Sequence, residues 1–135
     1  MNLIKLIPFS VRERIRKIVF GKNHFHDVVE YLAAIAPGAK VFDVGAQHGY
    51  ETILCAKSGM WVWAFEPNIP AREKMWSNLV LEGVDGGVRL SYMAVADKFI
   101  PGRVTTCADA MNFYGTSPDF LKIDTDGSDL KVIEG

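Results

Sequence analysis

Apolar and polar positions change their spacing along the chain, and the change falls near residue 38. After that point, short continuous apolar runs alternate with longer segments whose apolar residues recur every three or four positions. Continuous apolar runs indicate strands buried on both faces, and the longer spacing indicates helices. Because strands and helices alternate, the pattern predicts an α/β fold with a largely parallel sheet. The predicted strands are 40–45, 61–67, 86–96 and 119–124.

Helices are predicted after the first two of these strands, at 50–59 and 69–84. In the second helix, Met75 and Leu79 lie about one turn apart, so both are expected to face the core. Trp76 is a further candidate for the core of this helix.

The segment 98–118 is the hardest part of the chain to assign. Its sequence RVTTCADAMNFYG predicts a short extended piece followed by one or two helical turns, which Thr106 would cap. Trp61 and Trp63 alternate on one strand and therefore share a face. Packing of both rings against a helix is the preferred interpretation, and a substrate platform of Trp61, Trp63 and Trp76 is the alternative.

A basic amphipathic helix is predicted at the start of the chain, in the segment PFSVRERIRKIVFG. Ser10 and Glu13 form a capping box, and Gly21 ends the run. One face is apolar, and the other carries three arginines and a lysine. We expect this helix to dock on its own domain with its charges solvated, with contact to a membrane surface as the alternative.

A second helix, HFHDVVEYLAAIAPG, is predicted before the first strand and ends at Pro37 and Gly38. His24 and His26 lie at its start and are interpreted as polar helix-entry residues, because a metal site would need further ligands. The expected organisation is an N-terminal helical segment, 1–38, followed by an α/β domain, 39–135.

Composition limits the classes of function. Hydrophobic residues make up 49% of the chain and the net charge is −1, so a folded core is expected and nucleic-acid binding through bulk charge is not. Cys55 and Cys107 are isolated and lack zinc spacing, which predicts reduced thiols, no metal site and a cytoplasmic location. No apolar run reaches the roughly 18 residues of a membrane span.

The sequence KVFDVGAQHGYETILCA joins a strand to a helix through a glycine-spaced turn. This order of elements is the basis of Rossmann-like nucleotide sites. Gly45 would let the chain turn off the strand, and Gly49 would allow close approach of a helix or ligand. The spacing is G-x-x-x-G rather than G-x-G-x-x-G, so the glycine that admits a pyrophosphate is absent. The turn therefore disfavours NAD or FAD.

Two carboxylates accompany this turn. Glu66 lies at the tip of the second predicted strand, at the separation from Gly45 expected for an acid that binds ribose hydroxyls. Asp43 lies within an apolar strand and needs partners there, for which the loop amides or a cationic ligand group are candidates. A ribose site without a pyrophosphate cradle, close to acidic groups, favours S-adenosylmethionine, which carries a sulfonium and an ammonium.

Five blocks of the sequence resemble the FkbM family of S-adenosylmethionine-dependent methyltransferases, in the family's order. They are VFDVGAQHGYETI, AFEPN, SNLVLEGV, MAVAD and PDFLKIDTDGSDLKVIEG, within residues 40–135. The resemblance implies a Rossmann-like class I methyltransferase sheet, here preceded by two N-terminal helices. It also implies methyl transfer, mostly to oxygen, on varied small molecules and sugars.

The resemblance implies a role for each residue that matches a family motif. The first glycine motif, the ribose-binding turn and the strand end that borders the adenine would bind the cofactor. Asn78 matches an asparagine in the helix after the ribose-binding turn. The implied cofactor-binding residues are Asp43, Gly45, Ala46, Gly49, Glu66, Pro67, Asn68, Ala94 and Val95.

The substrate side of the family site is a D-x-E-G block, matched here by Asp124, Asp126 and Gly127, with aspartate in place of glutamate. Asp124 and Asp126 are the implied catalytic residues, and Asp124 is the first choice for the general base. His48 is a further candidate, although its place in the turn favours a structural role. Two carboxylates do not define a metal site.

The family's sheet continues with further strands, so the chain is expected to be a fragment. In that case the strand 119–124 would be an open edge with a poorly covered apolar face. A complete protein whose edge is covered by an oligomeric partner is the alternative. Three functions stay open: an O-methyltransferase acting on a small molecule or sugar, a truncated cofactor-binding module without catalysis, and a nucleotide-dependent oxidoreductase.

Overall fold

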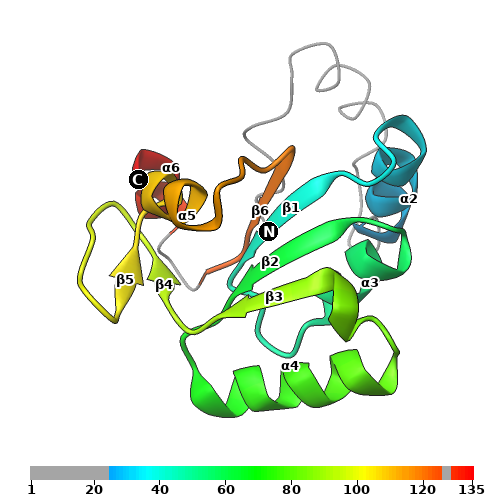
Figure 1. The fold of residues 1–135 in the computed structure, drawn as a ribbon, viewed down its shortest axis with the longest axis horizontal. Coiled ribbons are helices and arrows are strands. Elements are labelled where there is room, and N and C mark those ends of the chain that lie inside the picture. The colour runs from blue at the N-terminus through cyan, green and yellow to red at the C-terminus, as the bar shows by residue number, and fades with distance from the viewer. Residues whose placement is uncertain (1–24, 126–128) are drawn as a thin grey trace.

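The computed structural model describes residues 25–125 and 129–135, and the basic helix predicted near the N-terminus lies outside them. A four-stranded parallel sheet occupies the centre, in the order β3-β2-β1-β6 (Figure 1). A second sheet, β4-β5, has two short parallel strands. The strands are β1 Lys40–Val44, β2 Trp61–Phe65, β3 Val88–Ser91, β4 Ala94–Val95, β5 Val104–Thr105 and β6 Phe120–Ile123.

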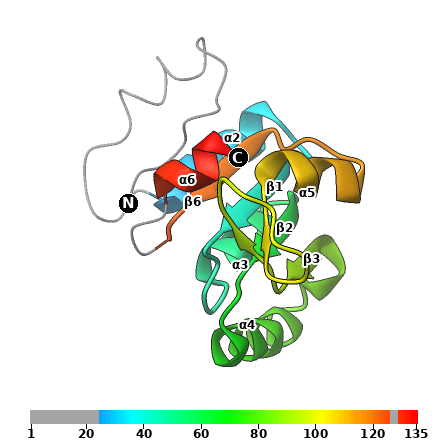
Figure 2. The same ribbon diagram turned by 90° about the vertical axis from the view of Figure 1, so that its left-hand side faces the viewer.

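Helices cover both faces of the central sheet, as expected for continuous apolar strands. One face packs against α2, α3 and α4, and the other packs against α5, α6 and the β4 strand (Figures 1 and 2). The α/β fold with a largely parallel sheet buried on both faces, predicted from the apolar pattern, is therefore confirmed. The helices are α2 Phe25–Ile35, α3 Tyr50–Lys57, α4 Ile69–Leu81, α5 Cys107–Tyr114 and α6 Asp129–Glu134, with a 3₁₀ turn at Asp85–Gly87.

The single strand predicted at 86–96 is wrong, because the run divides into β3 and β4. The chain leaves the sheet after Ser91, whose carbonyl accepts a hydrogen bond from the Glu66 amide and whose hydroxyl accepts one from the Met93 amide. It then pairs with β5 instead of β2. The division carries Ala94 and Val95 to the side of the sheet's carboxyl ends, beside the loops described below.

Two tryptophans differ from their predicted environments. Trp76 is 47% exposed on the outer side of α4, whereas Met75 and Leu79 are fully buried as predicted. Trp61 is 54% exposed at the start of β2, so its predicted packing against a helix is wrong. Trp63 fulfils the same prediction, because its ring lies 6.4 Å from that of Tyr114 in α5.

The edge strand β6 is better covered than predicted. All four of its residues are buried. Phe120 packs in the core shared with α2, while Leu121 and Ile123 pack with Ala110 of α5 and Val132 of α6. Of the helices in the described ranges, none has both the length and the apolar character needed to cross a bilayer.

Helix α5 starts at the predicted cap. The Thr106 hydroxyl accepts a hydrogen bond from the Asp109 amide at 3.0 Å and donates one to the Asp109 carboxylate at 2.8 Å. Thr106→Ala should lower the free energy of unfolding by about 1 kcal/mol, because the cap is lost. Thermal denaturation should show a drop of about 3 °C. Thr106→Ser, which keeps the hydroxyl, is the control, and an unchanged melting temperature in the alanine variant would contradict the capping role.

Candidate functional site

A cavity of about 440 Å³ lies where the parallel strands end, at the carboxyl edge of the sheet. This edge is where ligands bind in open α/β folds. Each of three adjacent strands contributes the residue that follows it: Gly45 after β1, Glu66 after β2 and Asp124 after β6. The lining residues are Val44, Gly45, Gln47, His48, Phe65, Glu66, Pro67, Asn68, Ala71, Ala94, Val95, Ala96, Val104, Asp124 and Thr125.

Residues 45–49, called the glycine loop below, need glycine at both ends. Gly45 has a φ of +79°, and a Cβ there would overlap the carbonyl oxygen of Asp124. Gly49 has a φ of +82°, and a Cβ there would lie 2.5 Å from Cγ of Met75 in α4. A positive φ of this size is disfavoured for any residue with a Cβ, so both positions favour glycine. The predicted roles of a sharp turn at Gly45 and close helix approach at Gly49 are therefore confirmed.

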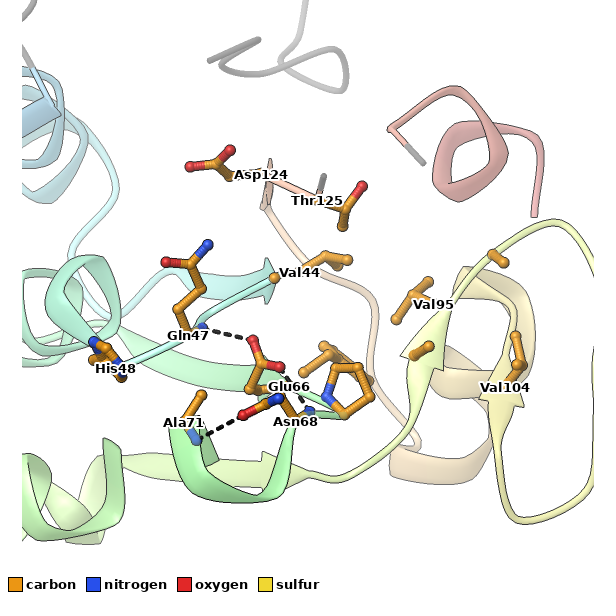
Figure 3. Close-up of a pocket in the computed structure, with 15 residues that line it drawn as sticks. Val44, Gln47, His48, Glu66, Asn68, Ala71, Val95, Val104, Asp124 and Thr125 are labelled. Carbon is orange, nitrogen blue, oxygen red and sulfur yellow. Dashed lines mark hydrogen bonds between the residues drawn. The ribbon is translucent and has the colours of Figure 1, made fainter. Parts of the chain in front are cut away.

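Glu66 connects the glycine loop to the start of α4. Its two carboxylate oxygens accept hydrogen bonds from the backbone amides of Gln47 and Asn68, each at 2.8 Å (Figure 3). The residue is 5% exposed, yet its carboxylate borders the cavity. A carboxylate can accept about four hydrogen bonds, so two acceptor positions are left for a ligand.

Two asparagines fix the segments on either side of Glu66. The Asn68 side chain accepts a hydrogen bond from the Ala71 amide at 2.9 Å and caps α4 (Figure 3). The Asn78 side chain donates to the His48 carbonyl at 3.0 Å and ties α4 to the glycine loop. Gln47 has a φ of +50°, which is uncommon for a residue other than glycine. These bonds hold the loop in an uncommon conformation beside the cavity.

The loop amides, one of the two kinds of partner predicted for Asp43, are not its partners in the structure. Its carboxylate accepts a hydrogen bond from the Thr52 hydroxyl at 2.5 Å and pairs with the Lys122 ammonium at 2.8 Å. Asp43 is 2% exposed and lies behind the cavity lining. Burial acts to lower the pKa of Lys122, but the charge of Asp43 and its hydrogen bond, helped by Glu51 and Asp124, raise that pKa above its usual value.

The structure brings most of the sequence-predicted site residues to one cavity. Ala46 and Gly49 are buried and, like Asp43, do not line it. Asp126 lies outside the described residues. The prediction missed Thr125, the middle residue of the D-x-E-G block, and also Val104 and Ala71, which lie in no motif. The predicted residues that line the cavity are Gly45, Glu66, Pro67, Asn68, Ala94, Val95 and Asp124, together with His48, the further candidate for the base.

Charge on the cavity lining is negative. Glu66 and Asp124 are the only Asp, Glu, Lys or Arg side chains among the described residues that line it. The remaining lining is mostly apolar, with valines and alanines from β4 and β5 at one end. An anionic group is disfavoured beside two carboxylates, and a cationic group is favoured.

Neither cysteine belongs to this cavity. Both are free thiols in the structure, and Cys55 is buried as predicted. Burial, together with the charge of Asp43, raises the pKa of Cys55 to about 12. Burial also raises the pKa of Cys107. Within the described ranges, no three His, Cys, Asp or Glu side chains are arranged to hold a metal ion.

Comparison with known proteins shows that the chain is similar to solved structures in its fold. No family model and no curated protein matches the sequence. The crystal structure of cofactor-bound Rv0187 from MTB has a TM-score of 0.56 and 18% identity, over 87% of this chain and 51% of that chain. A putative O-methyltransferase from Klebsiella pneumoniae has a TM-score of 0.49 and 19% identity, over 87% and 60% of the two chains.

The O-methyltransferase TomG from Streptomyces achromogenes, solved in complex with SAM, has a TM-score of 0.49 and 15% identity, over 87% and 45% of the two chains. The chain thus spans about half the length of these three structures. With Rv0187 it shares the Rossmann-like α/β fold.

Proposed function

We propose that the chain is the cofactor-binding part of an S-adenosylmethionine-dependent methyltransferase. The observation that carries the proposal is the position of Glu66. Its carboxylate is fixed by two backbone amides beside the glycine loop and keeps acceptor positions toward the cavity. A pair of ribose hydroxyls fits such an acceptor. The cavity volume lies in the range of small-molecule sites.

The site suits a cationic adenosine derivative better than a dinucleotide. Gln47 occupies the position of the second glycine in the dinucleotide fingerprint, and its amide already donates to Glu66. A pyrophosphate there would lose that donor and would lie beside the carboxylates of Glu66 and Asp124. The sulfonium and ammonium of S-adenosylmethionine carry the opposite charge, and the apolar end at Ala94 and Val95 can cover the adenine ring.

When bound, S-adenosylmethionine supplies a methyl group on a sulfonium, which an acceptor oxygen takes by in-line displacement. The protein's contribution is chiefly placement, which can correspond to effective molarities of about 10⁵–10⁸ M. Glu66 would hold the ribose, and the glycine loop would fix its orientation. A hydroxyl acceptor loses its proton as the new O–C bond forms, and the Asp124 carboxylate would accept that proton. Asp126 stays a second candidate for this role.

The more specific proposal is O-methylation of a small molecule or sugar by a member of the FkbM family. Its support is the set of five sequence blocks. Three of these blocks contribute the glycine loop, Glu66 and Asp124, which meet at one cavity. Rv0187, whose fold the chain shares, was solved with a cofactor bound. A small-molecule acceptor would lie beside Asp124, whose carboxylate is among the groups that line the cavity.

Isothermal titration with S-adenosylmethionine, S-adenosylhomocysteine and NAD tests the proposal. We expect measurable heat with the first two ligands and none with NAD at the same concentrations. Binding of NAD alone would contradict the proposal and favour an oxidoreductase. Tight binding of S-adenosylmethionine without methyl transfer to a panel of hydroxylated acceptors would favour the cofactor-binding module that lacks catalysis.

A further inference from the structure

Three polar side chains are buried together between the central sheet and α3. Asp43 of β1, Thr52 of α3 and Lys122 of β6 are 2%, 0% and 4% exposed. They lie behind the cavity and do not line it. Their neighbours on this face of the sheet are apolar, and include Val41 and Cys55. A buried polar cluster among apolar side chains calls for a physical explanation.

The cluster contacts the first residue of the glycine loop and includes a residue of the helix that follows the loop. Asp43 and Lys122 are paired residues in the β1–β6 register, and their charged groups lie 2.8 Å apart. The Lys122 ammonium also donates to the carbonyl of Gly45, the first loop residue, at 3.5 Å. Thr52, which donates to Asp43, lies in the first turn of the helix that follows the loop. One ion pair therefore bonds the first residue of the loop, through Lys122, and the helix that follows the loop, through Thr52.

A buried ion pair is not needed to hold two parallel strands together. Desolvating the two charges costs several kcal/mol per ion, and apolar residues of similar volume are often as stabilising or more so. The net stabilisation of the fold by Asp43 and Lys122 is thus expected to be small. What apolar residues cannot supply is a directed contact to the Gly45 carbonyl and to the Thr52 hydroxyl.

We propose that Lys122 is a positioning residue, which acts with Asp43 to set the conformation of the glycine loop for cofactor binding. The link to the site runs through Gln47, whose amide donates to Glu66. If the loop entry moves, this amide moves away from Glu66, and the carboxylate is no longer fixed toward the ribose. The inference rests on the proposed function for its ligand, and on the contacts above for the loop.

The matched experiment compares two ion pairs. Asp43→Leu/Lys122→Met replaces the buried pair by apolar side chains, and Lys57→Met/Glu82→Leu removes the exposed pair between α3 and the end of α4. We expect both variants to stay folded by circular dichroism. In the first, hydrogen exchange of the Gln47 amide should be about tenfold faster and S-adenosylhomocysteine should bind about tenfold more weakly, the loss of about one hydrogen bond. The second should match the wild type in both measurements.

A milder variant covers the case in which the first does not fold. Thr52→Val keeps the volume and the ion pair but removes one hydrogen bond to Asp43, and should speed exchange of the Gln47 amide by a smaller factor. Folded variants with wild-type exchange of Gln47 would overturn the proposal, whether or not their affinity changes. Failure of the wild type itself to bind S-adenosylhomocysteine would instead contradict the proposed function, and the exchange comparison would still decide the role of Lys122.

Discussion

Replacing Glu66 with alanine is expected to weaken binding of S-adenosylmethionine by about 100-fold or more. Hydrogen bonds to a charged group contribute about 1.5–3 kcal/mol each, and two ribose hydroxyls would lose their acceptor. The same change removes the partners of the Gln47 and Asn68 amides, so the loop and the start of α4 lose their connection as well. Titration calorimetry on the folded variant measures the loss directly.

Two controls separate ribose binding from general damage. Glu82→Ala removes an exposed carboxylate that pairs with Lys57, far along α4 from the cavity, and should leave the affinity unchanged. Glu66→Gln keeps one good acceptor oxygen but turns an amide group toward a backbone N–H, so an intermediate affinity is expected. An alanine variant that is folded and binds as tightly as the wild type would exclude Glu66 as the ribose acceptor.

The sequence predicted well those features that depend on neighbouring residues. The strand, the turn with its two glycines and the following helix are encoded within 40–57, and the cap at Thr106 is encoded within four residues. Glu66 was found because its distance from Gly45 along the chain is set by one helix and one strand. Local pattern and fixed spacing therefore sufficed for the centre of the site.

Features that depend on distant partners were not predictable in the same way. The need of Asp43 for a partner follows from its apolar surroundings, but Lys122 is 79 positions later and becomes its neighbour only through the β1–β6 register. The division of 86–96 depends on hydrogen bonds at Ser91 and on pairing with β5, neither of which an apolar run reveals. Thr125 lines the cavity because it lies just after β6, which is the neighbour of β1 in the sheet.

The exposure of the tryptophan side chains also depends on tertiary packing. Helical spacing places Trp76 next to Met75 but about 100° around the helix, and the sheet is covered by the face that Met75 and Leu79 share. Trp61 and Trp63 share a face of β2, yet Tyr114 of α5 reaches the second ring only. Periodicity defines a face, and the elements that pack against that face decide how much of it is buried.

Gly45→Ala is expected to have the largest effect on stability. An alanine at φ +79° costs about 1–2 kcal/mol, and its Cβ would overlap the carbonyl of Asp124, which adds the 1–3 kcal/mol typical of overpacking. A total of about 2–5 kcal/mol corresponds to a fall of about 10 °C in melting temperature. Because the overlap forces β1 and the end of β6 apart, the variant should also bind S-adenosylmethionine weakly.

Gly38→Ala separates the two contributions. Gly38 has a similar φ of +72°, but a Cβ there meets nothing within 4 Å, so this variant carries the backbone strain without the overlap. The difference in unfolding free energy between the two variants therefore measures the close approach of the glycine loop to Asp124. If both variants lose the same free energy of unfolding, the end of β6 at Asp124 moves away from the added Cβ at no measurable cost. In that case the contact between the glycine loop and Asp124, the proposed base, would not be a rigid part of the site.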